Sequence, residues 1–158
     1  QNVAKATVSG FQVSAEYYFI DGLSLQTHAN WITGKETDDT KNEQVALRHA
    51  PPFYGSTLLK YHNKMFFIEA SAYYNSQIKN EDLAPSEQAK TDIYAKDAGG
   101  KPYSPGWYTL NLKTSYQFTK TLMVPARWEN ITNQRYRPYS SGIVAAGSNF
   151  IFSVRTSL

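Results

Sequence analysis

The sequence predicts an all-β fold, built as one antiparallel up-and-down sheet of about seven strands. Three observations support this prediction. Apolar and polar residues alternate over successive runs of roughly ten residues, the connections between these runs alternate between short and long, and Phe, Trp and Tyr make up 15% of the chain. Strands of ~9–11 residues with short turns at one end, long loops at the other and aromatic side chains near their ends are typical of a transmembrane β-barrel.

The first two strands are expected at 9–19 and 23–31, where apolar residues occupy nearly every second position. Side chains two residues apart lie on the same face of a strand, so each run has one apolar and one polar face. Asp21-Gly22 between them favours a tight hairpin. The polar segment 34–48 is expected to be a loop, with an acidic cluster formed by Glu36, Asp38, Asp39 and Glu43.

The third and fourth strands are expected at 53–61 and 66–75, joined by a tight connection at 62–64. From about residue 76 to residue 106 the chain becomes polar and carries Gly99-Gly100, Pro102 and Pro105. Connections as long as this one are usually functional or flexible.

The last three strands are expected at 108–118, 122–130 and 149–158, with a short turn at 119–120 and a loop at 132–148. The polar faces carry charges that suit a water-filled lumen: Glu16, Lys60, Glu69, Lys113 and Arg155. The aromatic residues near the strand ends are expected to form two girdles, from Tyr17, Tyr18, Phe19, Trp31, Tyr73, Tyr74, Trp107, Tyr108, Tyr116 and Phe118. A soluble antiparallel sandwich or barrel stays open as an alternative, because the same alternation can face a protein core.

Composition excludes several classes of protein. The chain has no Cys, which excludes disulfides and thiolate metal sites, and its net charge of +3 includes no run of Lys or Arg suited to nucleic acid. It lacks the ~18 consecutive apolar residues of a membrane helix. His28, His49 and His62 share no metal-binding spacing, and no catalytic group or cofactor site is predicted. A chain that opens on Gln1 is expected to be a mature product or a fragment.

Three motifs in the last third of the chain carry a family resemblance. They are Trp107-Tyr108-Thr109-Leu110-Asn111-Leu112, then Glu129-Asn130-Ile131-Thr132-Asn133-Gln134-Arg135-Tyr136-Arg137-Pro138-Tyr139, and Gly147-Ser148-Asn149-Phe150. With them, 107–158 resembles the TonB-dependent receptors, outer-membrane transporters of siderophores, haem, cobalamin and some glycans. The chain departs from the family at Ser148 (usually Arg), at Leu158 (usually a terminal Phe or Trp) and at Pro125 with Arg127-Trp128, which are expected to interrupt a strand.

The resemblance implies that residues 1–158 are the C-terminal segment of one barrel domain, part of a 22-stranded barrel whose plug and N-terminal strands lie outside this chain. It further implies a multi-pass protein of the Gram-negative outer membrane that imports a scarce ligand such as an iron–siderophore, haem or cobalamin, without bond chemistry. The implied partners are outer-membrane lipid, a small-molecule or chelate ligand, TonB through the missing N-terminal region, and the barrel-assembly machinery. The alternative is a barrel that imports nothing and docks a surface lipoprotein or a secretion partner.

The candidate ligand-binding residues form two sets. Arg135, Tyr136, Arg137 and Tyr139 interleave two guanidinium groups with phenol rings, a pattern that suits an anionic chelate through charge-assisted hydrogen bonds and aromatic contact. This stretch coincides with the structural motif of the family, so a purely structural role stays open. Tyr94, Tyr103 and Trp107, in and beside the long loop, form the second set.

Overall fold

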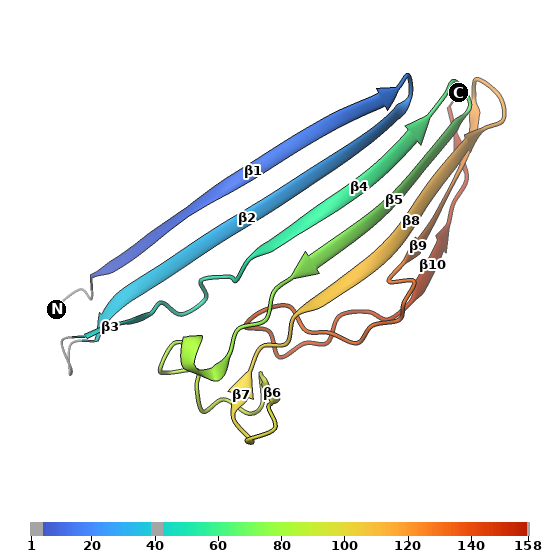
Figure 1. The fold of residues 1–158 in the computed structure, drawn as a ribbon. Coiled ribbons are helices and arrows are strands. Elements are labelled where there is room, and N and C mark those ends of the chain that lie inside the picture. The colour runs from blue at the N-terminus through green and yellow to red at the C-terminus, as the bar shows by residue number, and fades with distance from the viewer. Residues whose placement is uncertain (1–4, 39–42, 158) are drawn as a thin grey trace.

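The computed structural model describes residues 5–38 and 43–157, which form one large antiparallel sheet (Figure 1). Its seven main strands are neighbours in chain order, which confirms the predicted up-and-down sheet of about seven strands. The sheet is not closed into a barrel. The main strands are β1 (Ala6–Ile20), β2 (Leu23–Asp38), β4 (Tyr54–His62), β5 (Phe66–Asn75), β8 (Trp107–Gln117), β9 (Leu122–Glu129) and β10 (Asn149–Phe152).

The connections alternate in length as predicted, with short turns at one end of the sheet and long loops at the other (Figure 1). Gly22 adopts a φ of 79° in the first turn, which a residue with a side chain rarely adopts. A Cβ at this position would also collide with the backbone oxygen of His62. The Asp21-Gly22 signal therefore marks the hairpin correctly.

The expectation of a loop throughout 34–48 is wrong. β2 continues to Asp38, pairs with β1 as far as Glu36↔Ala6, and forms a second hairpin with β3 (Glu43–Ala46). Backbone hydrogen bonds to β1 on one side and to β3 on the other stabilise the extended part of β2. Such pairing does not depend on apolar side chains. Of the expected acidic cluster, Glu36 lies on β2 and Glu43 pairs with Asp38, while Asp39 lies outside the described residues.

The expected interruption at Pro125 and Arg127-Trp128 is also misplaced. β9 is continuous, and it is the predicted last strand that divides, into β10 and β11 (Arg155–Thr156). Ser153 N donates to Pro125 O at 3.1 Å, and Pro125 has no N–H to return the bond. The missing bond lies at the break between β10 and β11, whose registers on β9 are otherwise continuous. Leu158 lies outside the described residues.

The register gives the sheet two unlike faces. One row of cross-strand neighbours is apolar throughout: Tyr17, Leu25, Leu59, Ala70, Leu112, Trp128 and Phe150. The adjacent row, shifted by one residue, is largely polar and charged: Tyr18, Ser24, Lys60, Glu69, Lys113, Arg127 and Ile151. We call the first face the outer face and the second the inner face. Lys60, Glu69 and Lys113 lie on the inner face, as predicted.

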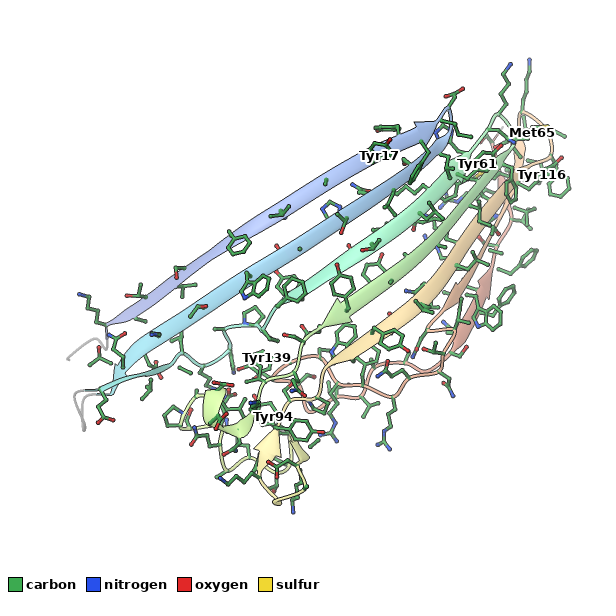
Figure 2. All side chains as sticks on the ribbon, in the orientation of Figure 1. Tyr17, Tyr61, Met65, Tyr94, Tyr116 and Tyr139 are labelled. Carbon is green, nitrogen blue, oxygen red and sulfur yellow. The ribbon has the colours of Figure 1, made fainter. Side chains whose placement is uncertain are left out.

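Aromatic side chains gather at both ends of the outer face. At the loop end, Phe11, Trp31, Phe53 and Tyr74 form a continuous row, with ring centroids 5.8, 4.7 and 5.9 Å apart. At the turn end, where Tyr17 and Tyr116 lie (Figure 2), Tyr17 contacts Phe19 and Tyr116 contacts Phe118. The prediction is wrong for three girdle residues. Alternation places Tyr18, Tyr73 and Trp107 on the inner face, whereas the girdles lie on the outer face.

The sheet has no core of its own. Large apolar side chains of the outer face are open, for example Phe11 at 61%, Tyr17 at 64% and Phe150 at 68% exposure. The buried hydrophobic residues of the described chain are Leu83, Ala84 and Tyr94, all in the long loop before β8. The outer face therefore needs a cover that residues 5–38 and 43–157 do not supply.

A pair of adjacent leucines tests the expectation that lipid covers the outer face. Leu59 lies in the middle row of the outer face, whereas Leu58 pairs with Gln26 and Ser71 on the inner face. In the full-length protein in lipid vesicles, Leu59→Lys is expected to lower the free energy of unfolding by about 2–4 kcal/mol, because it places a charge in the bilayer. Leu58→Lys is the matched control and is expected to change that free energy much less. Equal effects in urea-unfolding titrations would contradict the assignment of the faces.

Candidate functional site

The long connection between β5 and β8 folds into a compact unit at the loop end. It contains a 3₁₀ turn, η1 (Asn80–Asp82), and a small hairpin of β6 (Ala95–Lys96) with β7 (Pro102–Tyr103). Leu83 and Ala84 are 1% exposed and Tyr94 is 5% exposed, so this segment has a small core. Within the described residues, no helix is long and apolar enough to cross a bilayer.

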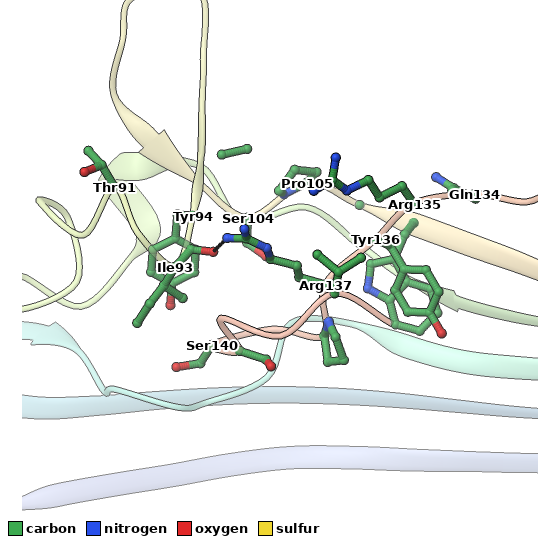
Figure 3. A pocket seen from close by; sticks show the side chains of 16 residues that line it. Thr91, Ile93, Tyr94, Ser104, Pro105, Gln134, Arg135, Tyr136, Arg137 and Ser140 are labelled. Carbon is green, nitrogen blue, oxygen red and sulfur yellow. Dashed lines mark hydrogen bonds between the residues drawn. The ribbon is translucent and has the colours of Figure 1, made fainter. Parts of the chain in front are cut away.

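This unit and the loop that follows β9 enclose a cavity of about 370 Å³, which we call the outer cavity (Figure 3). One wall comes from Thr91, Ile93 and Tyr94, and the opposite wall comes from Pro138, Ser140 and Ser141. At one end the rings of Trp107 and Tyr136 stack, with centroids 4.1 Å apart and planes inclined by 28°. None of the described residues that line the cavity is Asp or Glu, whereas two are arginines.

The structure brings five of the seven predicted binding residues to this one cavity: Tyr94, Trp107, Arg135, Tyr136 and Arg137. The two sets, separated by some 30 residues in sequence, thus share a site. Tyr139 instead lines a neighbouring cavity of about 600 Å³, together with Tyr54, Tyr73 and Trp107. Tyr103 lies apart from both cavities, beside Asp97 and Lys101.

Arg137 links the two walls of the outer cavity. Its Nη1 donates to the backbone oxygens of Asp92 and Ile93, at 2.9 Å each, and Figure 3 shows the contact with Ile93. Arg135, in contrast, is exposed at the cavity. The two arginines therefore differ: Arg137 holds the loops together, and Arg135 is available to a ligand.

A residue that the sequence analysis missed, Glu87, joins three loops. Its side chain is fully buried, and Ser140 Oγ and Tyr139 OH donate to its two oxygens at 3.1 and 3.3 Å. Arg48 Nε lies 3.5 Å from Oε1, and His49 Nε2 lies 3.9 Å from the same atom. No local signal marks Glu87, because it stands among other polar residues in an expected loop.

Two phenols pack beside this carboxylate. The rings of Tyr94 and Tyr139 lie 6.3 Å apart, and burial, reinforced by the charge of Glu87, raises the pKa of both hydroxyls. Both phenols therefore stay protonated in the folded protein beyond the pH at which they would ionise in an unfolded chain. The protonated phenols therefore stabilise the folded state fully below pH ~10. As pH rises above ~10, the phenols of the unfolded chain ionise first, and this stabilisation is lost.

Trp107 and Tyr136 also face the inside of the sheet. Together with Lys113, Arg127 and Glu129 they line a third cavity, of about 440 Å³, on the inner face. The stacked pair thus forms a partition between the outer cavity and the inner face. Trp107 Nε1 is buried and has no hydrogen-bond partner among the described residues.

The loop after β9 is anchored by the asparagines of the motif around residue 130. Asn130 is 4% exposed with a φ of 48°, and its side chain donates to the oxygens of Gln134 and Ala146 and accepts from Gln134 N. Asn133 accepts from Ser148 N, and Ser148 Oγ accepts from Trp128 Nε1, both at 2.9 Å. These residues set the path of the loop that carries Arg135.

No metal site is evident in residues 5–38 and 43–157, since no group of three or more His, Cys, Asp or Glu side chains comes together there. His28 lies on β2 opposite Ser14 and Ser56, His62 ends β4, and His49 joins Glu87. The three histidines therefore do not converge.

Comparison with known proteins gives a family match and a set of similar folds. Residues 1–132 match the family model described as TonB dependent receptor-like, beta-barrel. No curated protein matches the chain in sequence. The copper transporter OprC superposes with a TM-score of 0.75 over 97% of this chain at 17% identity.

Two further solved structures are similar. The siderophore receptor PiuA from Acinetobacter baumannii has a TM-score of 0.66 over 98% of this chain at 14% identity. The ferric citrate transporter FecA in the unliganded form has a TM-score of 0.70 over 96% of this chain, also at 14% identity. The chain covers 23%, 22% and 24% of OprC, PiuA and FecA, respectively, and so spans less than a quarter of each.

Replacing Asn130 tests whether its side chain anchors the loop after β9. Asn130→Ala removes three side-chain hydrogen bonds, each worth about 1 kcal/mol, and puts a less tolerant residue at positive φ. Amide exchange of Gln134 and Ala145 is expected to accelerate by roughly a hundredfold. Asn149→Ala, the same change on the exposed β10, is the control. Equal exchange in both variants would exclude Asn130 as the anchor.

Proposed function

Since the chain belongs to the TonB-dependent receptor β-barrel family, we propose that it is part of an outer-membrane receptor that imports a small anionic chelate. In this proposal residues 1–158 are the C-terminal segment of a 22-stranded barrel, and TonB engages the receptor through a region outside this chain. Receptors of this family are transporters and not enzymes, so the proposal involves no bond chemistry.

The single observation that carries the ligand class is the lining of the outer cavity. Arg135 and Arg137 contribute positive charge, while none of the described lining residues carries a negative charge. The stacked rings of Trp107 and Tyr136 offer an aromatic wall. A ligand with carboxylate or phenolate oxygens on a planar framework complements these groups.

The position of the cavity supports a role in uptake. It lies among the long loops, at the opposite end of the sheet from the short turns (Figure 1). In outer-membrane barrels the long loops face the outside of the cell. The inner face below it carries Lys60, Lys113 and Arg127. A ligand held in the outer cavity would therefore lie directly above the polar interior of the barrel, separated from it by Trp107 and Tyr136.

The other predicted partners, namely the barrel-assembly machinery and a surface lipoprotein, stay predictions. Outer-membrane lipid is the cover that the apolar outer face requires.

Arg135 is the residue to change first. In the full-length receptor, Arg135→Ala is expected to weaken binding of ferric citrate, used as an anionic probe, by tenfold or more, because a charge-assisted hydrogen bond contributes about 1.5–3 kcal/mol. Lys101→Ala removes a cation from the same region outside the outer cavity and is the control. Isothermal titration calorimetry measures both. If Arg135→Ala and Lys101→Ala bind the probe equally well, the outer cavity is not the anion site.

A further inference from the structure

We propose that Glu87 is the positioning residue of the outer cavity, and that its carboxylate makes the three long loops act as one cap. The loops in question are the segment before β4 that carries Arg48 and His49, the unit between β5 and β8 that carries Glu87 itself, and the loop after β9 that carries Tyr139 and Ser140.

The carboxylate is placed where it holds both walls of the cavity. Ser140 lines the outer cavity and donates to Glu87 Oε1 at 3.1 Å. Tyr94, seven residues after Glu87, lines the opposite wall and packs against Tyr139, the second donor to Glu87. Displacement of Glu87 would therefore move both walls.

Arg137 provides the second link between the same walls, through the backbone oxygens of Asp92 and Ile93. The outer cavity is thus closed by two connections of opposite charge, one cationic and one anionic. Only Glu87 also reaches the third loop, through Arg48 and His49. This contact extends the cap across the loop ends of β2, β4, β5, β8 and β9.

The chemistry requires a carboxylate at this position. All four neighbours present nitrogen or hydroxyl groups, and a carboxylate accepts on both oxygens. A glutamine has the same size, but it is neutral, and one of its two positions is an NH₂ donor that can no longer accept from Tyr139 or Ser140. Glu87→Gln therefore replaces one of the two hydroxyl donations and leaves Arg48 without its counter-charge.

Hydrogen exchange of the full-length receptor in detergent, without ligand, tests the link. Glu87→Gln is expected to accelerate amide exchange by about tenfold or more in all three segments, 47–53, 88–96 and 138–142. The control Glu81→Gln removes an exposed carboxylate from the same loop, paired only with exposed Lys79, and is expected to change none of them. Acceleration confined to the neighbourhood of residue 87, or none, would overturn the proposal.

Variants of the residues that contact Glu87 control for misfolding of the Glu87→Gln protein. Tyr139→Phe and Arg48→Gln each remove one partner and leave Glu87 in place, and each is expected to accelerate exchange in 88–96, a segment that contains neither changed residue. The unfolding midpoint of the barrel is expected to stay unchanged in both. Exchange in 88–96 that is unaltered in both variants would contradict the role of Glu87.

Ligand binding gives a second readout, which rests on the proposed function. Ferric citrate is expected to bind Glu87→Gln about tenfold more weakly than the wild-type receptor, and Glu81→Gln with unchanged affinity. If the loops loosen while the affinity of Glu87→Gln stays at the wild-type value, Glu87 does not position the binding cavity. If the wild-type receptor binds no ferric citrate, the proposed ligand class is wrong, and the exchange pattern alone decides whether Glu87 joins the loops.

Discussion

The structure depends on one constraint, the period of two along strands that are held in register. Because every main strand alternates and every pair is antiparallel, apolar side chains line up on the outer face and the charges Lys60, Glu69, Lys113 and Arg127 line up on the inner face of the middle of the sheet. A shift of one residue in any strand would place charges such as Lys60 or Lys113 among the outward apolar residues. Neither face is buried by the described chain, so the stability of the sheet depends on contacts outside the described residues, and lipid is the proposed cover of the outer face.

The ends of the strands fix the positions of the long loops. Trp107 begins β8 and Asn130 directly follows β9, so the partition and the anchor of the last long loop are both fixed to the sheet. The loops are then tied to one another by polar contacts more than by apolar burial. Arg137 reaches two backbone oxygens, and Glu87 collects donors from two other loops. These contacts fix the two walls of the outer cavity relative to each other.

Much of this arrangement is visible in the sequence, because alternation and turn residues are local signals. The strands, the short turns and the two sets of candidate binding residues, one with Arg135 and Tyr136 and the other with Trp107, follow from neighbouring residues. The inward direction of Tyr18, Tyr73 and Trp107 follows from the same alternation. Their position near strand ends predicts girdle residues only if the face of each residue is left out of account. Two features could not be predicted from neighbouring residues in the sequence. The extension of β2 with β3 depends on backbone pairing between polar residues, and the role of Glu87 depends on loops some 40–50 residues apart in sequence.

The most direct test of the central claim measures what each face of the sheet contacts in a membrane. The chain contains no Cys, so single cysteines at positions 57 to 61 can carry a spin label without competition from this segment. In the full-length receptor in lipid vesicles, oxygen from the bilayer is expected to reach labels at 57, 59 and 61 more readily than those at 58 and 60, with a period of two. A profile without this period, or with the opposite phase, would contradict the account, because it would mean that lipid does not cover the apolar face.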